Sequence, residues 1–329
     1  MIRRARFSTP TFTPGFAVYS TSRRIKIPPQ FPVTSSCPEP TCPCAETPAG
    51  LDIDHEQNLH GTMASYSQHL LIATGQPDWK SRIEEDGPDQ SWGILARRLK
   101  KLLGRGGKYS DPYNNILITN SSFKPQTSDM MTASAFLFPG FQYLPEIPLD
   151  ETDLDTFVRA YLLPLDIHRA HDILSPEKQE SMRRAPELQS TFTNVVKLTS
   201  SPTILICGHG HRDRRCGIMG SLLQAEFRRV LRHCGFSVDP DRVDGAGHAN
   251  VELISHIGGH KFAGNVIIYV PPSMGSSLGA PSALAGKGIW YGRVEPKHVE
   301  GIVKETILNG RVIIDHFRGG IDENGILRL

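Results

Sequence analysis

Short apolar runs alternate with amphipathic segments in the first half of the chain, and this pattern predicts an α/β fold. The run "HLLIAT" at 69–74 is typical of a buried strand, whereas apolar residues at spacings of three and four predict a helix over 91–103. Further β-branched and aromatic runs predict strands at 115–122 and 134–144, followed by a helix at 150–163. We therefore expect ordered structure to begin near residue 66.

The same order of elements returns in the second half. We expect a strand, a helix, three strands and a final helix at 203–208, 218–234, 249–257, 265–272, 288–294 and 296–310. Pro296 suits the first turn of the final helix and Gly310 suits its end. Two successive βα–ββα patterns suggest a duplicated α/β unit.

Composition shifts divide the chain into five segments. They are a leader, a Pro- and Cys-rich connector, a smaller or degenerate N-terminal α/β domain, a polar linker and a C-terminal α/β domain, at 1–25, 26–65, 66–175, 176–201 and 202–329. With 39% hydrophobic and 21% charged residues, the composition is that of a soluble globular protein. The sequence contains no apolar run of the roughly 18 residues that a membrane span needs.

The net charge of +2 conceals a basic start. Residues 1–38 carry six basic side chains and no acidic one, which leaves 30 basic against 34 acidic residues, or −4, for the remainder. An acid-free, Ser/Thr-rich and Arg-rich leader is typical of a mitochondrial transit peptide. We therefore expect a mitochondrial protein, most simply of the matrix, with the intermembrane space as the alternative. Because no basic domain stands behind the leader, nucleic acid is not an expected partner.

Two sequence stretches carry candidate metal ligands. "CGHGHRDRRCG" places Cys207 after an apolar strand and Cys216 just before a helix, and "HIGGH" supplies His256 and His260. A helix N-terminus favours a thiolate. The glycines between the histidines disfavour a helix, and the Glu of a zinc-protease HExxH motif is missing. Any one of these residues taken alone is an ordinary buried cysteine or loop histidine, but the four together predict a metal centre.

Ligand type and spacing decide which metal is expected. Structural zinc usually takes cysteines two to four residues apart, whereas eight residues separate Cys207 from Cys216. Spaced pairs suit a [2Fe–2S] cluster, in which each iron takes two protein ligands, and two cysteines with two histidines form a Rieske-type set. Two thiolates leave the oxidised cluster roughly neutral, so we expect a reduction potential well above that of an all-cysteine ferredoxin.

Three motifs, "CGHGHRDRRCG", "HIGGHKFAGN" and "WYGRVEPKHVEGIVKETILNGRVI…HFRGG", resemble the sucrase/ferredoxin-like family of thioredoxin-like [2Fe–2S] ferredoxins, in its fungal mitochondrial branch. The resemblance covers nearly everything after about residue 35. It implies a thioredoxin-like fold for the C-terminal domain and cluster ligation by Cys207, Cys216, His256 and His260. The histidines stand where bacterial relatives use cysteine, so a low potential is not expected. We find no carboxylate pair to support a sucrase activity.

Other polar residues remain candidates for supporting roles. His209 and His211 are rival ligands, although we expect them and Arg212 to act as hydrogen-bonding neighbours of the cluster. Cys37, Cys42 and Cys44 form a C-x4-C-x-C pattern that matches no trusted zinc or iron–sulfur signature. They are redox thiols, a second metal site or plain connector cysteines. Cys234, at a helix end, is most simply a packed thiol.

Three functions are compatible with these residues. The first is single-electron transfer to or from a redox partner protein, with the cluster as cofactor and no enzymatic activity of its own. The second is thiol–disulfide exchange by the N-terminal cysteines, and the third is a zinc-stabilised binding module. Metal content separates the third function from the first two.

Overall fold

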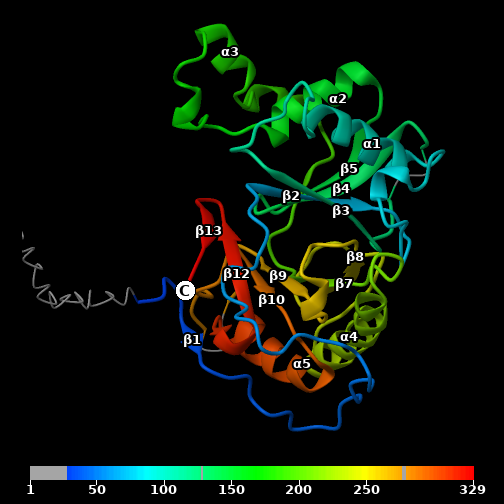
Figure 1. Cartoon of the computed structure of the whole chain (residues 1–329), viewed down its shortest axis with the longest axis vertical. Coiled ribbons are helices and arrows are strands. Elements are labelled where there is room, and N and C mark those ends of the chain that lie inside the picture. Colours follow the sequence, from blue (N-terminus) through cyan, green and yellow to red (C-terminus); the bar gives the residue numbers. More distant parts are fainter. Residues whose placement is uncertain (1–27, 127–128, 276–278) are drawn as a thin grey trace, which may run out of the picture.

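Two sheet units with the same strand order make up the α/β fold (Figure 1). The computed structural model describes residues 28–126, 129–275 and 279–329. The leader expected at 1–25 lies outside the described residues. None of the helices in the described part of the chain is long and apolar enough to cross a membrane.

The N-terminal unit combines a parallel strand pair with an antiparallel extension. Its elements are β2 (Gln68–Ala73), α1 (Ser91–Leu103), β3 (Ile116–Ser121), β4 (Thr132–Phe138), β5 (Gln142–Pro148) and α2 (Glu151–Phe157, continued by one π-helical stretch, Val158–Leu162). The segment that follows adds α3 (Pro176–Ser181) and β6 (Val196–Lys197). Strand β2 pairs in parallel with β3 and antiparallel with β4, and β4 pairs antiparallel with β5.

The C-terminal unit repeats this arrangement. Its elements are β7 (Thr203–Cys207), α4 (Arg214–His233), β8 (Asn250–Ile254), β9 (Val266–Val270), β10 (Lys287–Tyr291), α5 (Pro296–Ile302, continued by Val303–Leu308), β11 (Val312–Ile313), β12 (Phe317–Asp322) and β13 (Gly325–Leu327). Strand β7 pairs in parallel with β8 and antiparallel with β9, and β9 pairs antiparallel with β10. Both units therefore have βαβ–ββα connectivity.

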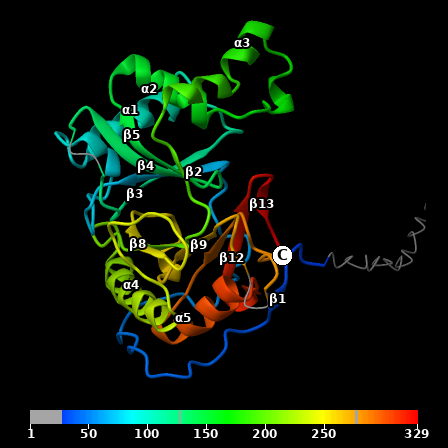
Figure 2. The ribbon, with the colours of Figure 1, turned by 180° about the vertical axis from the view of Figure 1, so that it is seen from behind.

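The two units meet through the faces of their sheets. Strands β3 and β8 join them by one residue pair, Ser121 with Ile254, which makes a formal eleven-stranded sheet. Buried side chains of both units, such as Leu71 and Phe136 against Leu205 and Tyr269, belong to one continuous apolar cluster. Helices α1 and α2 cover the far side of the N-terminal unit, and α4 and α5 cover the far side of the C-terminal unit (Figures 1 and 2).

Some predicted elements differ from the observed ones. The strand expected over 134–144 is the hairpin of β4 and β5, because Pro139 and Gly140 form a turn and Phe141 adopts φ 48°. The polar segment 176–201 contains α3 and ends in β6, which pairs with the edge strand β5. The short strands β11, β12 and β13 follow the last predicted helix and have no counterpart in the prediction.

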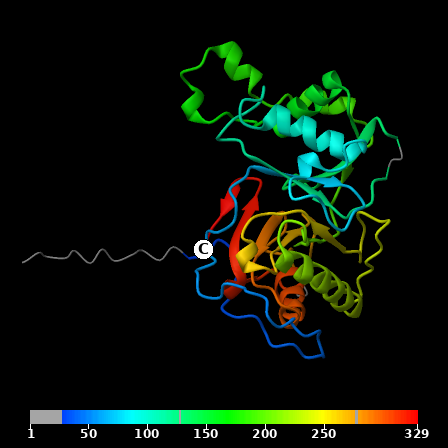
Figure 3. The same ribbon diagram turned by 45° about the vertical axis from the view of Figure 1, so that its right-hand side comes forward.

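The connector crosses the outer side of the C-terminal unit as an ordered but largely irregular chain (Figure 3). Its one regular element, β1 (Val33–Thr34), pairs in parallel with β11. Farther along, Thr41 bonds to the carboxylate of Glu300 on α5 through its backbone amide, at 3.0 Å, and through its hydroxyl, at 2.5 Å. These bonds attach this part of the connector to α5.

A buried polar chain links the two units at their centre. The hydroxyls of Tyr66 and Tyr269 lie 2.9 Å apart, and the indole of Trp290 donates to Tyr66 at 2.9 Å. His69 bonds Tyr269 through Nδ1 at 3.0 Å and Thr119 through Nε2 at 2.7 Å. Burial lowers the pKa of His69 to about 3, so its imidazole is neutral in the folded protein.

This neutral imidazole predicts a loss of stability in mild acid. An unfolded histidine takes up a proton below about pH 6.5, whereas folded His69 does not, so stability is fully present above pH 6.5 and falls as the pH is lowered. Urea unfolding of the metal-free protein should show His69 alone removing about 2 kcal/mol between pH 7 and pH 5. His69→Gln should lose that part of the slope, and an equal slope in both proteins would contradict the assignment.

Candidate metal centre

Two buried thiols meet where β7 ends and α4 begins. Cys207 is the last residue of β7 and is 1% exposed, while Cys216 lies in the first turn of α4 and is fully buried. The amide of Cys207 donates to the carbonyl of Asn265 at 3.0 Å, which fixes the strand end. The predicted placement of one thiol at the strand end and one at the helix N-terminus is observed.

The helix of Cys216 begins at Arg214, four residues before the predicted start at 218. Asp213 caps this helix because its side chain accepts a hydrogen bond from the amide of Arg215. Gly217 allows close packing inside this helix, since a Cβ there would lie 2.7 Å from the Cα of Gly210. Cys216 therefore lies inside the helix and directs its thiol toward Cys207.

His256 completes a compact donor group. It follows β8, which is the parallel neighbour of β7, so both strands deliver their residues to the same sheet edge. The ligand atoms of Cys207, Cys216 and His256 all lie within 4.8 Å of one another. The Nδ1 atom of His256 is buried and has no hydrogen-bond partner in the described part of the chain. A histidine that lies beside two thiols and keeps a buried ring nitrogen without a partner has the surroundings of a metal ligand.

His260 lies beside this group on its solvent side. Its ring centroid is 5.3 Å from that of His256, and its side chain is 46% exposed. Its Nε2 atom lies 4.0 Å from the Asp213 carboxylate, and the three-residue donor group does not include it. Gly258 and Gly259, at φ 83° and 72°, bend the chain between the two histidines, as the glycine pair predicts.

The pKa values of the two thiols are shifted in opposite directions. A hydrogen bond from Cys216, together with His256, holds the pKa of Cys207 well below its ordinary value. The bond to Cys207, followed by burial, raises the pKa of Cys216. The pair therefore binds one proton between its sulfurs in the absence of a metal, and a metal that bound both thiolates would displace it.

His209 is occupied by other hydrogen bonds. Its Nε2 atom lies 2.9 Å from the carbonyl of Trp79 and 3.0 Å from that of Lys80, and its Nδ1 atom accepts from the amide of His256 at 3.0 Å. The ring is buried, and it packs edge-on against Trp79. His209 therefore supports the segment that carries His256.

His211 and Arg212 face the N-terminal unit. The Nδ1 atom of His211 lies 2.8 Å from the carboxylate of Asp78, with the side chain 72% exposed. Arg212 donates to the hydroxyl of Ser81 at 3.1 Å. Both side chains thus fasten the loop that bears the thiols to the 78–81 loop of the other unit.

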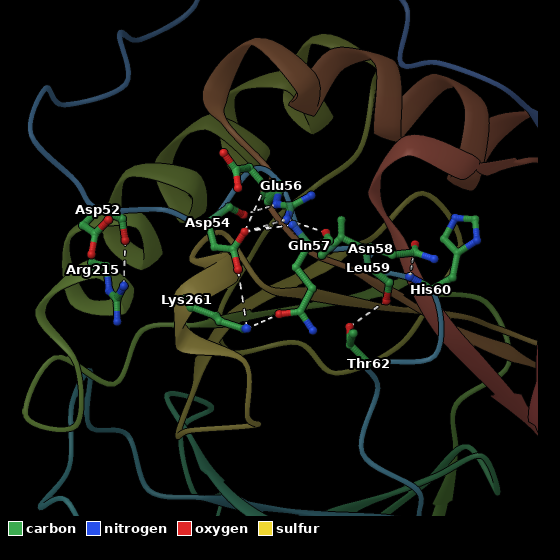
Figure 4. Close-up of polar contacts among 11 residues, drawn as sticks. Asp52, Asp54, Glu56, Gln57, Asn58, Leu59, His60, Thr62, Arg215 and Lys261 are labelled. Atoms are coloured by element: carbon green, nitrogen blue, oxygen red, sulfur yellow. Dashed lines mark hydrogen bonds and ion pairs between the residues drawn. The ribbon is translucent and has the colours of Figure 1, made fainter.

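Residues 52–62 of the connector, which we call the strap, contact Arg215 and Lys261 (Figure 4). The carbonyl of Asp52 accepts from Arg215, the neighbour of Cys216, at 2.6 Å. Asp54 is tied to Lys261, the neighbour of His260, by an ion pair of 3.4 Å and by a backbone bond of 2.8 Å. No local pattern predicts these contacts, because they join positions more than 150 residues apart.

The connector cysteines occupy different surroundings. Cys37 packs against α5, where a Cβ on Gly301 would lie 2.5 Å from its sulfur, and burial raises its pKa to about 12. The thiol of Cys42 lies 3.2 Å from a Glu300 oxygen and 3.5 Å from an Arg229 nitrogen. Cys44 is half-buried, and Cys234, expected to be packed, is exposed at the end of α4.

The donor chemistry fits an iron–sulfur centre. Two buried sulfurs with an unpartnered imidazole nitrogen, and a second imidazole beside it, offer the soft and intermediate ligands that such clusters bind. If the cluster is present, Cys207 and Cys216 would hold one iron and His256 and His260 the other. The chemistry that the group supplies when bound is the uptake and release of one electron.

Comparison with known proteins identifies the class to which this fold and site belong. Residues 59–319 match the family described as sucrase/ferredoxin-like. This match covers more than half of the chain and includes all four candidate ligands. The chain belongs to that family.

Individual relatives are fungal proteins of similar length. The chain is 32% identical over 298 residues to altered inheritance of mitochondria protein 32 of Meyerozyma guilliermondii, covering 87% of this chain and 95% of the relative. The protein of the same name from Debaryomyces hansenii is 32% identical over 295 residues, with the same coverage. Actin patches distal protein 1 of Saccharomyces cerevisiae is 26% identical over 267 residues, covering 79% and 75%. No solved structure matches the chain.

Proposed function

We propose that this chain is a mitochondrial [2Fe–2S] redox protein that passes single electrons between partner proteins. The observation that carries the proposal is that the ligand atoms of Cys207, Cys216 and His256 lie within 4.8 Å of one another, and that the buried Nδ1 of this histidine has no hydrogen-bond partner among the described residues. His260 is the proposed fourth ligand. The ferredoxin-like family name and the relatives named for mitochondrial inheritance support the redox role and the organelle.

The proposed fold assignment and boundaries follow the repeated strand order. The βαβ–ββα connectivity of the C-terminal unit, 202–329, is that of a thioredoxin-like domain, and the N-terminal unit, 66–175, repeats it. In this assignment 176–201 links the domains, 26–65 is the connector and 1–25 is a transit peptide to the matrix. Cys207 and Cys216 then stand at the strand end and the helix start of the domain.

The cysteines and the histidines have different roles at the proposed centre. The two cysteines enclose it from the core side, because both are buried in the apolar layer between the sheets. His256 is half-buried, and the exposed edge of His260 provides the shortest route to the surface. An electron can therefore reach a docked redox partner protein through the histidine side without passing through the core.

The exposed histidine side identifies where a partner would dock, but the charges around it are mixed. Arg212 and Arg214 are exposed, while Asp54 and Asp213 lie nearby and are partly buried. Asp213 forms an ion pair with Arg215, and this pair lowers the pKa of Asp213. We accordingly leave the partner defined only as a redox protein.

Metal analysis of the anaerobically purified chain tests the proposal. We expect two irons and two acid-labile sulfides per chain, a coloured protein, and an electron paramagnetic resonance signal of Rieske type after reduction by dithionite. Cys216→Ser should lose most of the iron because it removes one of two buried sulfurs. Cys234→Ser, the same change at an exposed thiol, should retain it. A colourless protein with one zinc per chain, unchanged after iron–sulfur reconstitution, would reject the electron-transfer function.

One observation favours a second function based on the connector thiols. The sulfur of Cys42 lies 3.5 Å from a guanidinium nitrogen of Arg229, and neither Cys42 nor Cys44 is fully buried. Cys37 is unsuited to the role because its pKa is raised to about 12. Thiol–disulfide exchange by Cys42 would predict that Cys42→Ser abolishes exchange with a glutathione disulfide while the iron content stays unchanged.

A further inference from the structure

A buried arginine, Arg318 on β12, stands beside the candidate centre without a carboxylate partner. Its side chain is 1% exposed. Its hydrogen bonds run to neutral groups: to Thr62 through Nε at 3.0 Å and Nη2 at 2.7 Å, to Asn265 at 2.6 Å and to the Gly258 carbonyl at 3.3 Å. Among the described residues, no Asp or Glu forms an ion pair with it. An uncompensated buried charge costs several kcal/mol, so its presence calls for a reason.

The contacts of Arg318 converge on the turn between the two histidines. It bonds Gly258 directly, and Asn265, its second partner, donates from Nδ2 to the carbonyl of Gly259 at 2.9 Å. A Cβ on Gly259 would lie 2.6 Å from Nη2 of Arg318, so the guanidinium lies against this glycine. Arg318 therefore fixes the backbone that carries His256 and His260.

The same guanidinium lies in an apolar and aromatic environment that screens charge poorly. Its central carbon is 5.6 Å from the ring centroids of both Phe262 and Trp290. Burial lowers its pKa to about 10, and the negative charge of the Cys207–Cys216 pair opposes this shift. At this pKa the group remains protonated at neutral pH, and its field acts on the two sulfurs.

We propose that Arg318 is a positioning residue with a second role, which is to supply the fixed positive charge that makes the centre easier to reduce. The inference rests on the proposed function. One electron added by a reductant such as dithionite makes the centre more negative by one charge. A buried cation stabilises that state more than the oxidised one, and it does so strongly where water is excluded. The strap shares in this arrangement because Thr62 holds Arg318 in place.

The experiment measures the reduction potential of the full-length, cluster-loaded protein by redox titration followed by circular dichroism and paramagnetic resonance. Arg318→Gln should reduce the equilibrium constant for reduction at least tenfold, which corresponds to about 59 mV for one electron. Arg318→Lys, which keeps the charge, should stay within about threefold of the unsubstituted protein. If Arg318 had only a structural role, the reduction potentials of Arg318→Gln and Arg318→Lys would not differ in this way.

Two further variants keep the test decisive. Arg184→Gln is the matched control, since Arg184 is also partly buried and bonds a carbonyl, that of Leu163, without an acidic partner in the described structure. It should leave the potential unchanged. If Arg318→Gln fails to retain iron, Asn265→Asp decides, because it places a carboxylate against the guanidinium and should lower the potential in a loaded protein.

The outcomes separate this inference from the proposed function. Full iron content with equal potentials in the Arg318→Gln, Asn265→Asp and unsubstituted proteins would overturn the role of Arg318 while the electron-transfer function stands. Absence of an iron–sulfur cluster from the unsubstituted protein would overturn the proposed function itself, and the inference with it. The inference is supported if Arg318→Gln lowers the reduction potential and Arg184→Gln does not.

Discussion

Replacing both His256 and His260 by cysteine is expected to lower the reduction potential by roughly 200 mV or more. Two thiolates in place of two neutral imidazoles add two negative charges to the cluster, and reduction must then add an electron to a more negative group. Rieske-type centres span about −150 to +300 mV, whereas plant-type four-cysteine ferredoxins lie near −400 mV. The double variant should also change the reduced paramagnetic resonance signal from Rieske-type to ferredoxin-type.

Redox titration of the double variant against the unsubstituted protein provides the measurement. His211→Cys makes the same chemical change at a histidine that bonds Asp78 and is 72% exposed, so it should leave the potential and the spectrum as they are. A double variant with an unchanged potential and a full complement of iron would show that the histidines are not ligands. In that case His209, already bonded at both nitrogens, would be a poor substitute, and ligands outside the described donor group would have to be sought.

The sequence pattern predicted helices and strands well where the period of the apolar residues matches the face that the element buries. The helix over 91–103 begins and ends at the predicted residues, because one face is apolar and Gly104 follows it. The hairpin of β4 and β5 was missed, since the aromatic run continues through the turn at Pro139 and Gly140 and hides it. Strands as short as β11 and β13 carry too few residues for any period to be read.

Part of the candidate site could be predicted from local sequence pattern, and part depends on contacts between residues far apart in the sequence. The pattern predicted one site from Cys207, Cys216, His256 and His260. Parallel pairing of β7 and β8 brings the segments of the first three to one edge, and His260 lies beside this group. Pattern alone did not indicate Arg318 or the strap, whose contacts span 53 to 256 residues of sequence. Such contacts depend on the packing of the completed fold, so no local spacing in the sequence predicts them.

Replacing His209 by alanine is expected to destabilise the metal-free protein by about 3 kcal/mol. The change removes a buried ring and leaves the carbonyls of Trp79 and Lys80 and the amide of His256 without their side-chain partner. Each buried group left unsatisfied costs about 1–3 kcal/mol, and relaxation or water entry recovers part of the total. The lost edge-on contact with Trp79 adds to the effect.

Urea unfolding of the metal-free variants distinguishes this supporting role from ligation. His211→Ala, the neighbouring control, removes an exposed side chain paired with Asp78 and should cost less than about 1 kcal/mol. If His209 were a ligand instead, its replacement would cost iron but little stability without metal, so equal stabilities of the two alanine variants would contradict the structure. Because the amide of His256 depends on His209, the less stable variant should also release iron faster to a chelator, which links the packing between the two sheet units to retention of the centre.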